Sequence, residues 1–275
     1  MDPLSRATNL QRKDDGIHYA KVQSRVSYPE DGNDDYLRIE DRSFWFRHRN
    51  DIIIAAIRNF HGGGAFFDIG GGNGFVAKGI QDAGYPVVLV EPGPSGARNA
   101  KARGIEHVAC STLQDAGFPP ERMEAMGLFD VLEHIEDDLG FLKLAHGHLK
   151  PGGRIYISVP AYGFLWSNED EQAGHFRRYT LGELRKVLTN AGFSMTYGTY
   201  FFSPLPLPIF LMRSIPSRLG SRRGPSDRKT LDQEHRTGSG PLDRVMRAVW
   251  AWEKNRVAKC RRIPFGSSCF MVATK

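Results

Sequence analysis

The chain is poor in cysteine, and the three that it has, Cys110, Cys260 and Cys269, are widely spaced. Small secreted domains that rely on disulfides carry several closely spaced cysteines, so no disulfide framework is expected. No Cys-x-x-Cys pair or Cys/His cluster has the spacing of zinc ligands, and the sequence therefore predicts no bound metal. Both absences favour a reducing compartment, and we expect a cytoplasmic protein.

Long apolar runs are lacking as well. Residues 1–16 are polar and charged, without the apolar core of a secretory signal. The longest apolar stretch is Phe201–Met212, which contains three prolines. It is far shorter than the roughly 20 residues that a membrane-spanning helix needs, so we expect a soluble protein.

Positive charge is concentrated in one part of the chain. The formal net charge is +6, and residues 213–262 contain fourteen Lys/Arg against five Asp/Glu. A basic character confined to one segment indicates a local anionic contact rather than a protein that coats nucleic acid. A solvated helical insertion that happens to be basic explains the same composition, and both interpretations stay open.

Short β-rich runs alternate with helical patterns that end at glycine between residues 66 and 202. This alternation is typical of βαβ units and a mostly parallel sheet. With 275 residues the chain can bury one sizeable core, so one elaborated domain is expected. The seven expected strands are 65–68, 86–91, 107–110, 126–129, 154–159, 193–202 and 266–274.

Four parts of the chain differ in pattern. Residues 1–60, polar at first and then helical and aromatic, precede the sheet and are expected to form a lid over its ligand edge. Residues 61–202 carry the sheet core. Residues 203–264 form an insertion that starts with a proline-broken apolar run and continues as a basic tract, and residues 265–275 supply the last strand.

The first expected strand ends in the glycine turn Asp68-Ile69-Gly70-Gly71-Gly72-Asn73-Gly74, which a helix follows. Such a turn lets a ligand approach the backbone, and a helix N-terminus favours negative charge. A dinucleotide fingerprint would need a third glycine at position 75, where the chain has Phe75, and a P-loop would need Gly-Lys-Ser/Thr. Glu91, which ends the second expected strand, can accept hydrogen bonds from both ribose hydroxyls of a nucleoside.

Five motifs in this order resemble those of class I S-adenosylmethionine-dependent methyltransferases of the Methyltransferase-11/23 type: FFDIGGGNG, LVEP, FDVLEHIEDD, LKPGGRIYISVP and GHFRRYT. The resemblance covers about residues 66–202. It implies a Rossmann-like seven-stranded α/β sheet that binds S-adenosylmethionine and releases S-adenosylhomocysteine. It also implies methyl transfer to oxygen or nitrogen of a small-molecule acceptor, with lipid-like and secondary-metabolite acceptors both open.

The resemblance assigns cofactor roles to residues at the ends of the expected strands. Asp68 and Gly70 would orient the methionine amino group, and Gly72 would let the cofactor lie against the backbone. Glu91 would bind the ribose, and Pro92 would flank the adenine. The other predicted cofactor residues are Gly71, Asn73, Gly74, Thr112, Leu113, Phe129 and Asp130; of these, Thr112 and Leu113 stand where the family often has an acid near the adenine amine.

Two histidines are predicted to be catalytic. Methyl transfer requires alignment of the acceptor with the methyl carbon and the sulfur, and a base only where the acceptor must lose a proton. His134 and His175 follow the fourth and fifth expected strands, at the carboxyl ends where open α/β sheets bind ligands. Either imidazole can accept a proton near neutrality, although each also suits a hydrogen-bonding strut.

Aromatic and basic side chains of nearby segments are predicted to line the acceptor pocket, because aromatic rings offer a large contact area. For the aromatic residues, ordinary core packing is the alternative. Arg177 and Arg178 would bind an anionic acceptor, or would lock their loop through Glu169, Asp170 or Glu171. The predicted acceptor residues are Trp45, Arg49, Tyr162, Trp166, Arg177, Arg178 and Tyr179.

Two other functions stay open: an RNA methyltransferase that uses the basic insertion, and an accessory protein that binds the cofactor without catalysis. The RNA function is disfavoured because Phe129-Asp130-Val131-Leu132 replaces the Asn/Asp-Pro-Pro-Tyr tetrad of base-amino methyltransferases. The apolar and basic composition of residues 201–262 predicts, in addition, peripheral contact with an anionic membrane or an acceptor with an apolar body.

Overall fold

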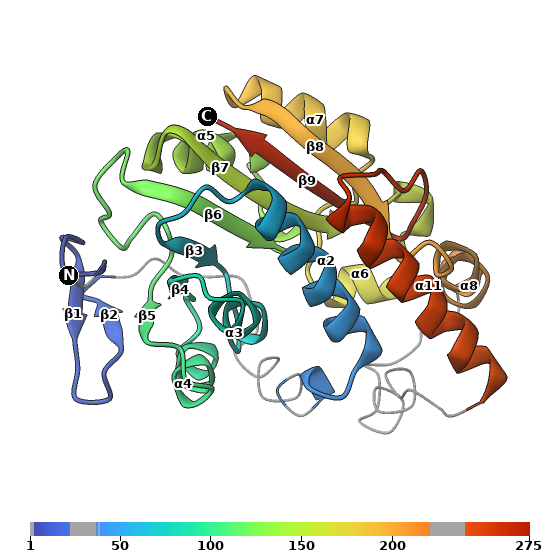
Figure 1. Cartoon of the computed structure of the whole chain (residues 1–275), viewed down its shortest axis with the longest axis horizontal. Helices are drawn as coiled ribbons and strands as arrows, with labels where there is room; N and C mark the ends of the chain where they lie inside the picture. Colours follow the sequence, from blue (N-terminus) through green and yellow to red (C-terminus); the bar gives the residue numbers. More distant parts are fainter. Residues whose placement is uncertain (1–2, 23–36, 38, 221–239) are drawn as a thin grey trace.

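The computed structural model describes residues 3–22, 37, 39–220 and 240–275, and it centres on one large sheet (Figure 1). The strand order is β1-β2-β5-β4-β3-β6-β7-β9-β8. The described strands are β1 (Leu10–Arg12), β2 (His18–Ala20), β3 (Phe66–Ile69), β4 (Val87–Val90), β5 (His107–Cys110), β6 (Met123–Phe129), β7 (Leu149–Pro160), β8 (Ser194–Phe201) and β9 (Ser268–Thr274).

The seven strands β3 to β9 confirm the predicted Rossmann-like α/β sheet. Strands β3 to β7 pair in parallel in the order β5-β4-β3-β6-β7. The last strand, β9, inserts between β7 and β8 and runs antiparallel to both, so that Thr274 pairs with Arg154 on one side and Ser194 on the other.

A hairpin of β1 and β2 extends the sheet beyond β5, and the sequence analysis missed it. Tyr19 of β2 pairs in parallel with Cys110 of β5. The hairpin gives a weak sequence signal because few of its side chains are buried: Leu10 and Ile17 are, whereas Gln11 is exposed. Part of the segment predicted as a lid therefore continues the sheet. Residues 23–36 and 38 of that segment lie outside the described residues.

Helices cover both faces of the sheet (Figure 1). One face carries α2 (Phe44–Phe60), α3 (Phe75–Asp82), α4 (Pro94–Ala102) and α11 (Pro241–Ala258), and the other carries α5 (Asp138–His148) and α7 (Leu181–Asn190). Ile52 of α2 and Val257 of α11 belong to the first apolar layer, in which both are fully buried. Leu142 of α5 belongs to the second layer. Helix α2 thus packs on the sheet and not only over its edge.

The insertion after β8 is joined to the core by a buried carboxylate. It contains α8 (Pro206–Ile209), the π-helical turn η3 (Phe210–Ser214), α9 (Ile215–Arg218) and α11, while residues 221–239 lie outside the described part. Glu253 of α11 is fully buried and bonds to His48 Nε2 of α2 at 2.7 Å. It also accepts from the backbone N–H groups of Phe202 and Ser203, at 2.9 and 2.7 Å.

We expect Glu253→Gln to lower the free energy of unfolding by about 2 kcal/mol, because an amide nitrogen replaces one accepting oxygen and leaves a buried donor unpaired. Urea unfolding measures this loss. Glu106→Gln is the matched control, since the Glu106 side chain is 82% exposed, and it should change stability by less than about 0.5 kcal/mol. Equal stability of the two variants would show that the Glu253 contacts are dispensable.

Candidate functional site

The glycine turn between β3 and α3 depends on left-handed backbone conformations. Gly70, Gly72 and Gly74 have φ angles of 70°, 52° and 76°, which glycine adopts without a steric penalty. A Cβ on Gly74 would lie 2.9 Å from the Cβ and 3.1 Å from the Cα of Ala100 in α4. Close packing and backbone conformation therefore both require glycine at position 74.

Gly74→Ala should destabilise the fold by about 2 kcal/mol more than Gly84→Ala, which is its matched control. Gly84 also has a positive φ, 93°, but no atom lies within 4 Å of the Cβ that alanine would add there. The Gly84→Ala control therefore loses about 1–2 kcal/mol because alanine disfavours a positive φ, but it introduces no steric clash. Thermal unfolding compares the two, and equal losses would argue against a tight fit of the turn on α4.

Two buried carboxylates flank the turn, at the ends of the neighbouring strands β3 and β4. Glu91 accepts from the backbone N–H groups of Gly72 (2.9 Å) and Gly93 (2.7 Å), and burial raises its pKa. Asp68 accepts from the backbone of Ala77, while its Oδ2 is buried without a hydrogen-bond partner among the described residues. Burial raises the pKa of Asp68 to about 7, and the charge of Glu91 adds to the rise.

These carboxylates fit the cofactor that the sequence predicts. A cationic amino group would satisfy the unpartnered Oδ2 of Asp68, which otherwise bears the cost of burying a polar atom. Each oxygen of Glu91 accepts one backbone N–H and keeps a second lone pair that a ribose hydroxyl could use. The arrangement therefore has a partner both for the amino group and for the ribose hydroxyls of S-adenosylmethionine.

The predicted cofactor residues come together at the carboxyl ends of four adjacent parallel strands. Thr112 and Leu113 follow β5, and Phe129 and Asp130 end and follow β6. The hydroxyl of Thr112 is engaged locally, because it donates to Asp115 Oδ2 at 2.9 Å. The side chain of Thr112 is therefore committed to Asp115, whose backbone N–H also donates to the Thr112 hydroxyl at 3.0 Å.

The N-terminal segment contacts the turn through a polar network that the sequence analysis missed. The Asn73 side chain donates to Glu40 Oε1 at 3.1 Å, and Arg103 Nη2 pairs with Glu40 Oε2 at 2.7 Å. Arg103 also donates to the backbone carbonyl of Asn73 at 3.0 Å. Glu40 and Arg103 are 63 residues apart in the chain, so no local pattern could have indicated the pair.

Arg49 of α2 lies among the acidic groups of the site and is only 8% exposed. It donates to Asp130 Oδ2, while Ser158 donates to the other oxygen of Asp130 at 3.1 Å. Burial raises the pKa of Asp68, and the guanidinium of Arg49 opposes this rise. Asp130 itself has a φ of 57°, a left-handed conformation that is uncommon for residues other than glycine. Arg49, which the sequence predicts to contact the acceptor, thus also lies near Asp68, one of the two side-chain carboxylates that fit the cofactor.

The two predicted catalytic histidines face each other. Their ring centroids are 4.7 Å apart, and the ring planes lie at 76°. His175 Nδ1 bonds to Asp170 Oδ1 at 2.9 Å, and His134 bonds to the backbone of Gly174. Burial, and then the nearby His175, lower the pKa of His134 to about 4. His134 is therefore neutral at pH 7 and has little affinity for a proton there.

Three predicted acceptor residues are held by acids of their own surroundings. Arg178 Nε pairs with Asp170 at 2.8 Å. Arg177 pairs with Asp138 Oδ2 at 2.7 Å, and the Tyr179 hydroxyl donates to the same oxygen at 2.8 Å. These contacts fix the loop that carries His175, and contact of the three residues with an acceptor stays a prediction.

Two of the predicted aromatic residues stack on neighbouring rings. Trp45 stacks on Phe202 with ring centroids 5.6 Å apart, and Tyr162 stacks on Tyr200 at 5.0 Å. Trp166, which ends the short helical turn Gly163–Leu165, is half-buried. The stacked rings of Trp45 and Tyr162 thus take part in packing within the protein, and contact of these aromatic residues with an acceptor stays a prediction.

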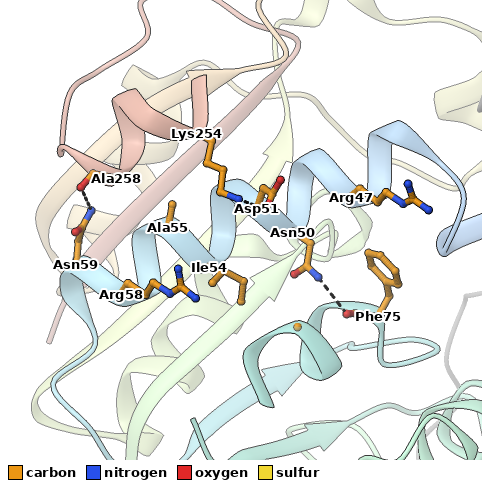
Figure 2. Close-up of a pocket in the computed structure, with 11 residues that line it drawn as sticks. Arg47, Asn50, Asp51, Ile54, Ala55, Arg58, Asn59, Phe75, Lys254 and Ala258 are labelled. Atoms are coloured by element: carbon orange, nitrogen blue, oxygen red, sulfur yellow. Dashed lines mark hydrogen bonds and ion pairs between the residues drawn. The ribbon is translucent and has the colours of Figure 1, made fainter. Parts of the chain in front are cut away.

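A separate cavity of about 570 Å³ lies between α2, α3 and α11, and Figure 2 shows the side chains around it. Lys254 pairs with Asp51 across it at 2.7 Å, and Asn50 donates to the Phe75 carbonyl at 3.4 Å. The lining residues are Arg47, Asn50, Asp51, Ile54, Ala55, Arg58, Asn59, Phe75, Gly79, Lys254 and Ala258. No residue predicted to hold the cofactor or the acceptor is among them.

The methyltransferase domain family matches residues 45–197, which is more than half of the chain. The chain belongs to this family. In this methyltransferase domain the matched stretch runs from α2 into β8, so the β1–β2 hairpin, α11 and β9 lie outside it.

Two curated relatives resemble parts of the chain. A probable S-adenosylmethionine-dependent methyltransferase from Mycolicibacterium smegmatis is 24% identical over 163 residues, which is 57% of this chain and 62% of the relative. A ubiquinone biosynthesis O-methyltransferase from Bradyrhizobium diazoefficiens is 32% identical over 106 residues, which is 37% of this chain and 42% of the relative. The chain therefore spans less than two thirds of the length of either relative.

A solved structure shares the fold of this methyltransferase domain. Phosphoethanolamine N-methyltransferase 2 of Haemonchus contortus, in complex with S-adenosyl-L-methionine, superposes with a TM-score of 0.57 at 18% identity. The match covers 94% of this chain and 61% of that chain. At this level of identity the likeness shows the fold alone.

Proposed function

We propose that the chain is an S-adenosylmethionine-dependent methyltransferase that methylates an oxygen atom of a small-molecule acceptor. The observation that carries the proposal is the buried Asp68 carboxylate, whose Oδ2 has no partner among the described residues, beside Glu91 and the glycine turn. Membership of the methyltransferase domain family supports the reaction. Likeness to ubiquinone biosynthesis O-methyltransferases supports oxygen, rather than nitrogen, as the atom that receives the methyl group.

The chain's own groups would bind and orient the cofactor. Asp68 would hold the amino group, Glu91 the ribose hydroxyls, and the backbone of residues 70–74 would lie against the cofactor. S-adenosylmethionine, when bound, supplies an electrophilic methyl carbon attached to a sulfonium. Arg49 would balance the charge of Asp68 and Asp130, which its guanidinium already approaches. Because these groups are buried, they would also exclude water from the reacting atoms.

The acceptor would enter from the loops that follow β6 and β7. His134 and His175 lie there and would face the acceptor hydroxyl. The stacked ring of Tyr162 and the half-buried Trp166 would contact an apolar body of the acceptor. This composition supports a lipid-like or aromatic acceptor over a small, highly charged one.

A methyl-transfer assay tests the proposed reaction. The full chain is incubated with methyl-labelled S-adenosylmethionine and a panel of hydroxylated aromatic and lipid-like compounds, and labelled products are counted. We expect transfer to a hydroxyl and none to the corresponding methyl ether. Cofactor binding without transfer to any compound would support an accessory protein instead, and absence of cofactor binding would refute the proposal at its first step.

We also propose that the insertion contacts an anionic membrane surface. The described residues contain no helix that is both long and apolar enough to cross a membrane. The stretch from α8 to Leu219 nevertheless exposes large apolar side chains next to Arg218, and Arg244 and Arg247 of α11 are exposed as well. The exposed apolar side chains are Leu207, Leu211, Met212 and Leu219. Apolar and basic groups together suit the interface of anionic lipids.

Vesicle sedimentation tests this contact. The chain should sediment with vesicles that contain anionic lipid and remain in solution with purely zwitterionic ones, because basic residues near the surface contribute about 1 kcal/mol each. Leu219→Glu should weaken the binding severalfold, since the Leu219 side chain is 81% exposed. Val22→Glu is the matched control, because Val22 is 74% exposed but lies next to the β1–β2 hairpin. Equal binding of both variants, or no binding by the unaltered chain, would rule the contact out.

A further inference from the structure

Three metal-ligand side chains that the sequence spacing did not group lie together at the acceptor edge of the sheet. Glu133 and His134 belong to the 3-10 turn η1 (Leu132–His134) after β6, and His175 comes from the loop after β7. Each offers one ligand atom, and the three atoms lie within 4.8 Å of one another. Because the three residues come from two segments about 40 residues apart, no Cys/His spacing in the sequence indicates the cluster.

Glu133 is buried in a way that calls for a positive partner. It is only 1% exposed, and its Oε2 is buried without a hydrogen-bond partner among the described residues. An unpaired carboxylate oxygen in the interior is costly unless a cation or a donor satisfies it. The guanidinium of Arg49 pairs with Asp130, three residues earlier in the chain, and acts on Glu133 only through its charge, as does that of Arg178.

Each histidine of the cluster is oriented by a further group. His175 Nδ1 bonds to Asp170 at 2.9 Å, which leaves Nε2 as the ring nitrogen available to a ligand. Asp170 is itself fixed by Arg178 at 2.8 Å and by the backbone N–H of Ser167 at 2.9 Å. His134 bonds to the backbone of Gly174. Histidines that ligate metals are held in this manner, by a carboxylate or a backbone carbonyl on the second ring nitrogen.

We propose that Glu133, His134 and His175 bind a divalent transition-metal ion beside the cofactor site. Two imidazoles and one carboxylate are the ligands that Zn²⁺, Co²⁺, Mn²⁺ and Fe²⁺ share in protein sites, whereas Mg²⁺ and Ca²⁺ prefer oxygen ligands alone. Three protein ligands leave coordination positions for water or for an acceptor.

A metal ion bound by Glu133, His134 and His175 would also limit the class of acceptor. This limit on the acceptor rests on the proposed O-methylation. The ion would polarise an acceptor hydroxyl, as Lewis-acid ions do, and favour loss of its proton to solvent water. The oxygen lone pair would form the bond to the methyl carbon while the carbon–sulfur bond breaks, and its electron pair would stay on sulfur. Acceptors with two neighbouring oxygen atoms, which can chelate the ion, would then be preferred.

Cobalt titration tests the metal site directly. The full chain, freed of metal by dialysis against a chelator, is titrated with Co²⁺ and followed by visible absorption and by calorimetry. We expect one ion per chain, and an affinity that falls more than about tenfold in Glu133→Gln and in His175→Gln. Glu136→Gln and His107→Gln are the matched controls, because both residues lie outside the cluster, and they should bind Co²⁺ as the unaltered chain does.

The outcomes separate the metal site from the proposed reaction. S-adenosylmethionine binding checks that each variant is folded; if Glu133→Gln fails this check, His175→Gln, whose side chain is 17% exposed, decides alone. Absence of Co²⁺ binding, or equal affinity in the cluster variants and the controls, overturns the metal site. Co²⁺ binding by a chain that methylates no acceptor would leave the site standing and would refute the proposed reaction.

Discussion

Asp68→Asn should weaken the binding of S-adenosylmethionine about 100-fold, a loss of about 3 kcal/mol. The carboxylate oxygen Oδ2 is buried and without a partner among the described residues, so a cationic amino group would be its main ligand. The asparagine amide keeps the size of the side chain, and its carbonyl can still accept from the Ala77 backbone. The variant should therefore fold normally and lose only the charge.

The pH dependence of cofactor binding gives a second measurement on the same group. Burial raises the pKa of Asp68 to about 7, and only its ionised form attracts the amino group. Affinity should therefore fall as the pH decreases below about 7, because at pH 6 only about one tenth of the carboxyl is ionised. Asp68→Asn should abolish this dependence. Asp82→Asn, at an exposed position of α3, should retain it.

Calorimetric titration between about pH 5.5 and about pH 7.5, where the α-amino group of the cofactor remains largely protonated, measures both effects. A chain whose affinity did not change with pH, or an Asp68→Asn variant that bound as tightly as the unaltered chain, would exclude Asp68 as the group that holds the amino end of the cofactor. The proposed function would then lack the observation that carries it.

Arg49→Ala should lower the free energy of unfolding by about 4 kcal/mol, because it leaves the carboxylate of Asp130 without its partly buried counter-ion. For a chain of this size such a loss corresponds to a decrease of roughly 10 °C in the melting temperature. Arg47→Ala, two residues earlier and exposed, is the matched control and should remain within about 0.5 kcal/mol of the unaltered chain.

The Arg49→Ala variant should also shift the pH dependence of cofactor binding to higher pH. Burial raises the pKa of Asp68, and Arg49 opposes this rise, so removal of Arg49 raises that pKa above about 7. Cofactor affinity should then begin to fall at a higher pH than in the unaltered chain. If the pH at which affinity begins to fall decreased or stayed the same, Arg49 would not act on Asp68, and its role would be limited to the pair with Asp130.

The sheet and the cofactor edge could be predicted from the sequence because their signals are local. The turn from Asp68 to Gly74 joins a strand to a helix within a few residues, and Glu91 ends the next apolar run. The fold then brings the two together, so that Gly72 donates to Glu91 at 2.9 Å. Parallel strands of one sheet place their carboxyl ends along one edge, which makes this contact a consequence of topology.

Contacts between distant segments could not be predicted in the same way. Two side-chain pairs join distant segments: Glu40 with Arg103, and His48 with Glu253. The sequence around these residues contains no pattern that would indicate the pairing. Position in the sequence indicates His134 and His175 as site residues but does not connect Glu133 with them, because the direction of three side chains on two loops depends on how those loops pack.

The β1–β2 hairpin has a consequence for self-association of the folded chain. An outer strand presents unpaired backbone groups that can add a strand from another molecule, and apolar strands are most prone to this. In β5, Val108, Ala109 and Cys110 are buried. If β5 were the edge strand of the sheet, it would therefore be prone to pair with a strand of another molecule. The hairpin pairs with β5, so that β1 is the edge strand on this side of the described sheet. Strand β1 has only three residues and carries the exposed cation Arg12. A chain that lacked residues 1–22 should therefore tend to aggregate through β5.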